Sequence, residues 1–248
     1  MKVSIITITY NSASTLPATL ESVIRQDYAH IEHILVDGNS TDTTRHILDE
    51  YAGCRSNVRY VSETDKGIYN AINKGIRMAT GDIIGILNSD DVLATPHVIS
   101  HIVQTFQSES QPEVVYGDLV YCNGSTVIRR WKSNVFDSKS LKYGWMPPHP
   151  TFYCLRKVYE EQGFYDEHFR ISADYDFMLR VFKQNYRVAY LPEVLVHMAT
   201  GGASNRNLHA LLRKSYEDMR VLRKNHIGAG SFTVVAKMLR KCKQFFRK

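Results

Sequence analysis

The sequence predicts an α/β fold in which a mainly parallel sheet is flanked by helices. In the first 91 residues, apolar strand-like runs alternate with segments of helical periodicity, which is the pattern of βαβ units. Each run also ends in a polar loop, and open α/β sheets bind ligands at that edge. The chain has 248 residues, of which 44% are hydrophobic and 23% charged, so it can bury one large core.

The elements of this alternation can be placed one by one. Strand-like runs cover residues 3–9, 33–36, 58–61 and 83–87, and helical segments cover residues 16–26, 43–52 and 67–78. Helix-capping residues precede the first two helices, at Asn11–Ser14 and at Ser40–Asp42. The third helix carries its apolar residues on one face, as a helix packed on a sheet does.

Beyond residue 91 the pattern is less regular. We expect a helix over 96–107, a strand over 114–116, a helix from near Ser172 and a strand over 187–190. Between them lies a long stretch, 121–153, whose aromatic residues include Phe136 and Trp145. Long loops in compact domains are usually functional, so this stretch is predicted to contact the substrate.

Cysteine usage and hydropathy exclude several classes of protein. The four cysteines are far apart and lack metal-type spacing, so neither a disulfide framework nor a zinc site is expected, and a reducing cytoplasm suits them. The apolar run at the N-terminus is too short for a signal peptide. No stretch approaches about 18 uninterrupted apolar residues, so the sequence predicts no membrane span.

The net charge of +6 is unevenly distributed along the chain. Residues 1–203 contain 19 Lys and Arg against 23 Asp and Glu, whereas residues 204–248 contain 12 against 2. The body is therefore −4 and the tail +10. An acidic body argues against a nucleic-acid groove, and a basic tail favours an anionic partner such as a phospholipid surface.

The tail is predicted to form two helices. In the second, over 234–246, basic residues fill one face and apolar residues recur at helical spacing. These apolar residues are Val235, Met238, Leu239, Cys242, Phe245 and Phe246. Such a helix favours an anionic membrane surface. The alternative, a helix docked on the body with a solvated basic face, stays open.

Acidic residues stand at the ends of three successive strands. Asp90 and Asp91 follow the fourth strand, and adjacent carboxylates repel each other unless a cation or hydrogen-bond donors compensate, which suggests a divalent metal beside a phosphate. Asp37 and Asp65 follow the two preceding strands, where a carboxylate can accept hydrogen bonds from a base or a ribose. The alternative for Asp37, and for the Asp90 pair, is capping of a turn or helix. Lys66 can neutralise a phosphate or be merely solvated.

Four segments in order resemble the family 2 glycosyltransferases with the GT-A fold: Thr9–Asn11, Val36–Asp42, Asp65–Gly75 and Ala79–Asp91. The resemblance is close over residues 1–91 and extends with gaps to about residue 205. It implies a nucleotide-diphosphate-sugar donor, UDP-linked, with Thr9, Asn11, Asp37 and Asp65 around the nucleoside. Within the element Ser89-Asp90-Asp91 it implies Asp90 near the ribose and Asp91 facing a divalent metal, Mn²⁺ or Mg²⁺.

The same resemblance points to a catalytic residue in the second half of the chain. Sugar transfer with inversion needs a general base for the acceptor hydroxyl, and a carboxylate can serve. Asp174 corresponds to the family's catalytic Asp, although Ala173 here replaces the frequent Glu before it. We therefore expect Asp174 to be the base.

Two histidines are further candidates for the site. Residues 146–151 resemble the segment that lines the family's acceptor pocket, which makes His149 a substrate-binding candidate, with a structural role as the alternative. His197 precedes residues 201–204, which stand where the family often has a flexible loop over the donor diphosphate. It is a candidate metal or phosphate ligand.

These features together predict the organisation and reaction of the chain. We expect a glycosyltransferase domain over 1–205, with a nucleotide-sugar half over 1–91 and an acceptor half over 92–205, and a basic helical tail over 206–248. The expected reaction is metal-dependent, inverting transfer of a hexose or N-acetylhexosamine. The acceptor would be a polyprenyl-diphosphate-linked sugar of bacterial surface polysaccharide, such as O-antigen or capsule. A cytoplasmic protein bound peripherally to the inner face of the cell membrane fits this reaction.

Two alternatives from other classes stay open. A nucleotidyltransferase that makes the nucleotide sugar also uses an α/β fold with acidic metal sites, but residues 9–14 lack the Gly-rich, basic phosphate loop that it usually needs. A non-catalytic carbohydrate-binding protein is the second. The presence of all the candidate aspartates in one chain argues against it.

Overall fold

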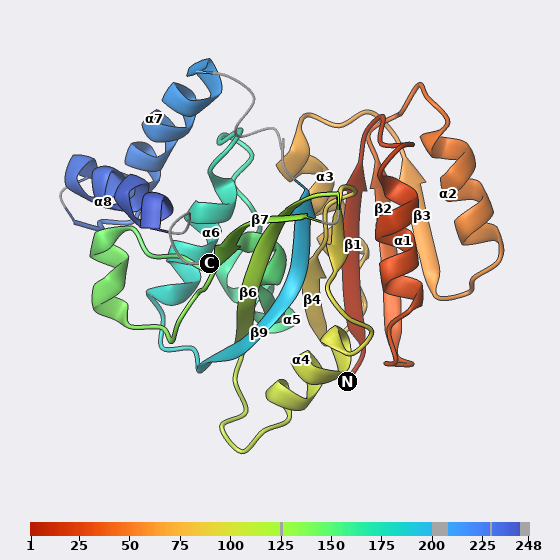
Figure 1. Cartoon of the computed structure of the whole chain (residues 1–248), viewed down its shortest axis with the longest axis horizontal. Helices are drawn as coiled ribbons and strands as arrows, with labels where there is room; N and C mark the ends of the chain where they lie inside the picture. Colours follow the sequence, from red (N-terminus) through yellow and green to blue (C-terminus); the bar gives the residue numbers. More distant parts are fainter. Residues whose placement is uncertain (125, 200–207, 229, 244–248) are drawn as a thin grey trace.

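A nine-stranded sheet forms the centre of the computed structural model, which describes residues 1–124, 126–199, 208–228 and 230–243 (Figure 1). The strand order is β3-β2-β1-β4-β8-β6-β9-β5, and β7 pairs with β6 outside this path. The strands are β1 (Val3–Thr9), β2 (Ile31–Asp37), β3 (Val58–Ser62), β4 (Ile83–Ile86), β5 (Asp91–Leu93), β6 (Val114–Asn123), β7 (Thr126–Trp131), β8 (Tyr153–Leu155) and β9 (Val188–Ala199).

Helices cover both faces of this sheet (Figure 1). They are α1 (Leu16–Ile24), α2 (Thr44–Gly53), α3 (Ile68–Met78), α4 (Val98–Phe106), α5 (Arg156–Gln162), α6 (Ala173–Phe182), α7 (Leu208–Lys224) and α8 (Gly230–Lys243). Two short 3₁₀ helices, η1 (Ser138–Tyr143) and η2 (His149–Thr151), lie between β7 and β8. The predicted α/β architecture with a mainly parallel sheet is confirmed.

Parallel pairing brings the ends of the first four strands to one edge. Strand β1 pairs in parallel with β2 and β4, and β2 pairs in parallel with β3. The register sets Thr9 opposite Asp37, and Asp37 opposite Ser62. The loops that carry the candidate donor-binding residues therefore leave the sheet side by side, at the top in Figure 1.

Alternation of side chains along β1 divides the core into two layers. Ile6 and Ile8 lie in the cluster that contains α3, α5 and α6, whereas Val3 and Ile5 lie in the cluster that contains α4 and part of α1. Successive residues of a strand point to opposite faces, so a strand that is buried along its whole length carries apolar residues on both. This is why the parallel strands read as continuous apolar runs.

The aromatic stretch over 121–153 is more ordered than predicted. Its first part is a β6–β7 hairpin, and η1 and η2 follow. Trp145 is buried, contacts the rings of Phe136 and Phe182, and donates a 2.8 Å hydrogen bond to the carbonyl of Ser133. Trp145 is therefore part of the core and Phe136 is partly buried against it, while substrate contact by the rest of this stretch stays a prediction.

The tail contains two helices that dock on the body. Val221 and Leu222 of α7 and Val234 of α8 are buried in the same cluster as α3 and α6. Helix α8 packs through Val234 and Lys237, so the side chains predicted as its apolar face, Val235, Met238 and Leu239, are 54%, 45% and 61% exposed. The side chains of Cys242, Phe245 and Phe246 lie outside the described part of the structure, as does the predicted boundary at 205/206.

Candidate active site

Asp37 orders the loop after β2. Its Oδ2 accepts hydrogen bonds from the backbone N–H of Ser40 at 3.0 Å and from the hydroxyl of Ser62 at 2.6 Å, and its Oδ1 accepts from the hydroxyl of Ser40. Asp37 is fully buried. These bonds support the alternative that the sequence left open, in which Asp37 caps its own turn. A contact with the donor stays a prediction and would require Ser40 or Ser62 to move.

Asn11 joins the loops after β1 and β2. Its backbone lies in the left-handed region, with φ at 49°, a conformation that Asn tolerates better than most residues. Its N–H donates to Oγ of Ser40 at 2.8 Å, and its Oδ1 accepts from the backbone N–H of Thr41 at 2.9 Å. The preceding residue in the predicted set, Thr9, is buried at the end of β1, and no group in the described part of the chain forms a hydrogen bond with its hydroxyl.

Asp65 approaches the end of β2 because residue 38 is glycine. A Cβ at Gly38 would lie 3.1 Å from Oδ2 of Asp65 and 3.3 Å from Cδ2 of Tyr10. Oδ1 of Asp65 is paired with the Nζ of Lys74 at 2.6 Å. The basic residue that holds Asp65 is therefore Lys74, whereas the predicted phosphate ligand, Lys66, is exposed.

The segment that joins β4 to β5 contains Ser89 and Asp90, and Asp91 is the first residue of β5. The Ser89 hydroxyl donates to the hydroxyl of Ser12 at 2.9 Å, which ties this loop to the one after β1. Asp90 is partly exposed and Asp91 is fully buried. Oδ2 of Asp91 accepts a 2.8 Å hydrogen bond from the side chain of Asn88.

The other carboxylate oxygen of Asp91 is an orphan. Oδ1 is buried and forms no hydrogen bond of ordinary geometry with a described group, although the backbone N–H of Ala199 is close enough to the carboxylate to oppose the rise in its pKa. Burial, and then the charge of Asp90, raise the pKa of Asp91 to about 8. A buried carboxylate oxygen that lacks a donor, beside a second carboxylate, is an arrangement that a divalent cation would stabilise. The residues at this strand end thus fit a metal.

His197 does not join Asp91. In the antiparallel β5–β9 pair, Asp91 lies opposite Met198 and Val92 lies opposite His197. Because successive side chains alternate, Asp91 and His197 lie on opposite faces of this strand pair. Among the described residues, no group of three or more His, Cys, Asp or Glu could hold a metal ion. The pairing thus does not bring His197 to the same face as Asp91, and the role of His197 as a metal or phosphate ligand stays a prediction.

Asp174 lies at the first turn of α6, and its contacts come from both halves of the molecule. Oδ1 accepts the backbone N–H of Tyr175 at 2.8 Å and lies 3.1 Å from the hydroxyl of Tyr69 on α3. The same hydroxyl lies 2.7 Å from the carbonyl oxygen of Ile171. Asp174 is partly exposed, so one carboxylate oxygen is held and the side chain still reaches solvent.

His149 lies in the same cluster as Asp174. Its Nε2 is 2.8 Å from the hydroxyl of Tyr165, and the two rings meet edge to face. Tyr165 in turn stacks on Tyr69, with ring centroids 5.7 Å apart. Burial lowers the pKa of His149, and the charge of Asp174 acts in the opposite direction. The structure therefore brings the two candidates His149 and Asp174 into one site.

Helix α3 links the two halves through residues that the sequence reasoning did not single out as functional. Asn73 donates to the carbonyl of Tyr165 at 2.9 Å and to Oε1 of Glu167 at 2.8 Å, and it accepts from the N–H of Tyr165 at 3.0 Å. Asn70 donates to Oε2 of Glu167 at 2.9 Å. One feature of the sequence could have indicated this role. The polar Asn73 directly follows the apolar Ile72, and both are buried on α3.

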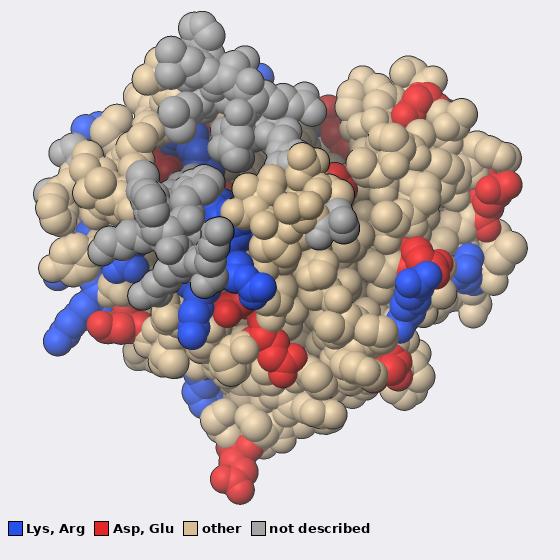
Figure 2. All heavy atoms as spheres, in the orientation of Figure 1, with Lys and Arg blue, Asp and Glu red and all other residues tan. Residues whose placement is uncertain are grey.

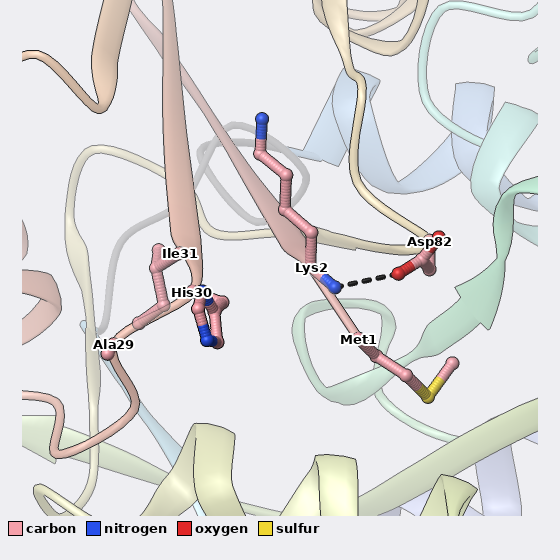
Figure 3. A pocket seen from close by; sticks show the side chains of 6 residues that line it. All are labelled: Met1, Lys2, Ala29, His30, Ile31 and Asp82. Carbon is pink, nitrogen blue, oxygen red and sulfur yellow. Dashed lines mark hydrogen bonds between the residues drawn. The ribbon is translucent and has the colours of Figure 1, made fainter.

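A surface hollow lies away from this site. Figure 3 shows its lining, formed by Met1, Lys2, Ala29, His30, Ile31 and Asp82. The backbone N–H of Lys2 donates to Oδ2 of Asp82 at 2.7 Å (Figure 3). These residues stand at the beginnings of β1, β2 and β4. The hollow is therefore at the opposite edge of the parallel strands from Asp37 and Asp91.

The family model described as "Glycosyl transferase family 2" matches residues 4–176. The chain belongs to glycosyltransferase family 2. It is 32% identical over 205 residues to the PGL/p-HBAD biosynthesis glycosyltransferase of Mycobacterium bovis, which covers 82% of this chain and 78% of that protein. An uncharacterized glycosyltransferase of Mycobacterium tuberculosis is 32% identical over 182 residues, with 72% and 68% coverage. The predicted glycosyltransferase activity is thus confirmed at the level of the family.

Solved structures of glycosyltransferases share the fold of this family 2 chain. The Staphylococcus aureus TarS fragment 1–349 in complex with UDP-GlcNAc superposes with a TM-score of 0.70 at 19% identity, over 91% of this chain and 65% of that one. A mannosyltransferase from Pyrobaculum calidifontis in complex with GDP-Man and Mn²⁺ gives 0.68 at 18% identity, over 100% and 76%. The predicted GT-A fold is confirmed.

Proposed function

We propose that this family 2 glycosyltransferase transfers a hexose or N-acetylhexosamine from a UDP-linked donor to a glycan acceptor with inversion, and that Asp174 is the general base. The observation that carries the proposal is the position of Asp174. It stands at the start of α6, partly exposed, with one oxygen held by Tyr175 and within reach of Tyr69 from the nucleotide-binding half. A carboxylate with one fixed oxygen presents the other in a defined direction.

The proposed reaction is a single displacement. Oδ2 of Asp174 takes the proton of the acceptor hydroxyl as that oxygen attacks the anomeric carbon of the donor, and the bond from this carbon to the diphosphate breaks. No hydrogen bond within the described residues occupies Oδ2. His149 contacts Tyr165, which stacks on Tyr69 beside the base, and this supports the proposal that His149 contacts the acceptor sugar.

We infer that Asp91 and Asp90 hold a divalent cation, Mn²⁺ or Mg²⁺, at the donor edge. When bound, this cation would carry the negative charge that develops on the diphosphate leaving group. The orphan Oδ1 of Asp91 and the adjacent carboxylate of Asp90 fit this role. Mn²⁺ in the mannosyltransferase complex supports the choice of metal.

The donor proposal rests on the loops at the edge of the sheet. The loops that follow β1, β3 and β4 contain four of the candidate donor-binding residues, Asn11, Asp65, Lys66 and Ser89. A fifth, Thr9, is the last residue of β1. Two fold neighbours are complexes with nucleotide sugars, one with UDP-GlcNAc and one with GDP-Man. The identity of the donor sugar is to be found by screening, because the conformations of these loops determine which sugar fits.

The acceptor is proposed to be a polyprenyl-diphosphate-linked sugar at the inner face of the membrane, used to build surface polysaccharide. Helix α8 supports this, since Phe232, Val235, Met238 and Leu239 are exposed on it and Arg240 is exposed beside them. Figure 2 shows much of the visible Lys and Arg on the half of the molecule that carries α7 and α8. An apolar face bordered by cations suits an anionic phospholipid surface.

Among the described residues, no helix combines the length and apolar character needed to cross a bilayer. Contact with the membrane is therefore proposed through the surface of α8.

A screen of donors tests the proposal. Purified full-length protein is incubated with UDP-glucose, UDP-galactose, UDP-N-acetylhexosamines or GDP-mannose, a sugar-diphosphate-lipid acceptor and Mn²⁺ or Mg²⁺. We expect release of a nucleoside diphosphate that depends on acceptor and metal. Pyrophosphate release from a nucleoside triphosphate and a sugar phosphate would instead indicate a nucleotidyltransferase, and donor binding without turnover across the panel would indicate a binding protein.

A further inference from the structure

The two acidic residues of the tail are both buried against the start of α6. Residues 204–248 contain 12 Lys and Arg but only Glu217 and Asp218 as acids. Both are on α7, and they are 6% and 4% exposed. Carboxylates are rarely buried unless donors or cations compensate for the lost hydration, so their partners indicate what these two residues do.

Glu217 binds three consecutive backbone N–H groups. Its Oε1 accepts from Arg170 at 3.2 Å, and its Oε2 accepts from Ile171 at 2.8 Å and Ser172 at 3.1 Å. These residues form the turn that enters α6, and Ser172 is the residue immediately before the helix. Orphan N–H groups at a helix start attract a negative charge. Glu217 supplies that charge from a separate helix.

Asp218 extends this contact through the side chain of Ser172. The Ser172 hydroxyl donates to Oδ1 of Asp218 at 2.8 Å, and Nζ of Lys237 on α8 lies 2.8 Å from Oδ2. Lys237 also lies 3.4 Å from the ring centroid of Tyr175. Burial acts to raise the pKa of Asp218, but the ammonium group of Lys237 holds the pKa below its ordinary value.

The C-terminal end of α7 binds the same turn of α6. Nζ of Lys224 lies 3.1 Å from Oδ2 of Asp176, and the side chain of Asn225 donates to Oδ1 of Asp176 at 2.8 Å. Asp176 is also paired with Arg180 at 3.0 Å. Asp174 thus stands between two contact points of α7, at residues 170–172 and at Asp176.

We propose that Glu217 and Asp218 are positioning residues that set the orientation of the Asp174 carboxylate. The proposal rests on the proposed role of Asp174 as the base. Ile171 is held from two sides, since its N–H binds Glu217 and its carbonyl lies 2.7 Å from the Tyr69 hydroxyl. Tyr69 is also the residue that approaches Oδ1 of Asp174. A shift of the 170–172 turn would therefore change the direction of the base.

The tail accordingly has a role in the reaction that is separate from any contact of its basic residues with a membrane. A displacement of about 1 Å in a reacting group is enough to lower a rate by orders of magnitude. Replacing Glu217 by Gln and Asp218 by Asn keeps the size of the side chains but removes their negative charge. Each amide also has an NH₂ group in place of one oxygen, and this group cannot accept a hydrogen bond from the N–H and O–H donors of residues 170–172. We expect the turn to loosen while the folded core persists.

Steady-state kinetics of Glu217→Gln and Asp218→Asn test the proposal. We expect kcat to fall by about 10- to 100-fold, with the donor KM and the Kd for UDP within about twofold of wild type. Glu160→Gln, the same change at an exposed position of α5, is the matched control and should leave kcat unchanged. Unchanged kcat in both α7 variants, or an equal loss of donor affinity and kcat, would overturn the proposal.

A double-mutant cycle separates positioning from a general loss of stability. Ser172→Ala and Asp218→Ala remove opposite ends of one hydrogen bond, so their effects on kcat should be non-additive. Additive effects would contradict transmission through Ser172.

Amide hydrogen exchange provides a readout that does not need turnover. In Glu217→Gln we expect faster exchange at residues 170–172, with protection retained in the second half of α6. Unaltered protection at these amides would reject Glu217 as their partner. If the wild type fails to turn over any donor but the exchange result holds, the proposed reaction fails while the contact made by α7 stands.

Discussion

The hydroxyl of Tyr69 lies 3.1 Å from Oδ1 of Asp174 and 2.7 Å from the carbonyl oxygen of Ile171. One hydroxyl proton thus faces two acceptors. Burial, and then the charge of Asp174, raise the pKa of Tyr69 well above its ordinary value, so the phenol stays protonated. Tyr69 is therefore positioned to donate to Oδ1 and so to orient the carboxylate, whose other oxygen, Oδ2, is the one proposed to take the acceptor proton.

Replacing Tyr69 by Phe is expected to lower kcat by about 10-fold or more, because a hydrogen bond to an ionised group is lost. The donor KM should change little, since Tyr69 is on the face of α3 toward residues 165–174. Stopped-flow or steady-state assays of nucleoside diphosphate release measure both. Tyr143→Phe, an exposed tyrosine on η1, is the control, and equal kinetics of the two variants would rule out the role given to Tyr69.

Replacing Asp91 by Asn is expected to separate folding from metal binding. The variant removes a buried carboxylate with an orphan oxygen, so the metal-free protein should unfold at an equal or higher temperature than wild type. The rise in Tm that Mn²⁺ produces should be lost, because binding to the native state stabilises it. Differential scanning calorimetry with and without Mn²⁺ gives both values. An unchanged Mn²⁺-dependent rise would exclude Asp91 as a ligand.

A charge placed on the outer face of α8 is expected to weaken membrane binding. Leu239 is 61% exposed, so Leu239→Glu should fold normally and yet reduce sedimentation with vesicles rich in anionic phospholipid by several-fold. Ile24→Glu, which introduces the same charge at an exposed position of α1, is the matched control. Similar binding by both variants would indicate that α8 does not contact the lipid.

Acid is expected to destabilise the protein partly through His33. This residue is fully buried between Thr7 and Tyr51, and burial lowers its pKa to about 3. The unfolded chain binds the proton near pH 6.5 and the native state does not, so the free energy of unfolding falls as the pH drops from 6.5 toward 3. Between pH 6.5 and 5 the loss is up to about 2 kcal/mol.

Urea denaturation at pH 7 and pH 5 measures this loss. His33→Gln cannot be protonated and should show a smaller decrease between the two values than wild type. Equal decreases in the two proteins would mean that His33 does not contribute to the pH dependence.

The parallel half of the fold was predictable from the sequence, since the strands and helices of the first 91 residues recur at regular spacing and β1, β2 and β4 are buried on both faces. The meeting of Asp37, Asp65 and Asp91 at one edge followed from parallel pairing. That Asp37 accepts hydrogen bonds from Ser40 and Ser62 did not follow, because loop hydrogen bonds depend on conformations that spacing does not encode.

The second half was harder to predict because its contacts are between residues distant in sequence. The orientation of α8 depends on a pair between Lys237 and Asp218, which brings a basic residue inward and leaves Val235 and Leu239 outside. The amphipathic pattern alone leaves open whether the apolar face of α8 meets a membrane or packs on the body. The aromatic residues around Trp145 were read as substrate contacts because composition does not distinguish a core from a binding surface.

The central claim is that Asp174 is the general base, and the most direct test compares transfer and donor binding in Asp174→Asn. The amide keeps the hydrogen bond to Tyr175 but cannot take a proton, so transfer should fall by about 10²- to 10⁴-fold. Isothermal titration should give a Kd for UDP in the presence of Mn²⁺ within about twofold of wild type. Turnover by Asp174→Asn at a rate close to wild type would contradict the claim.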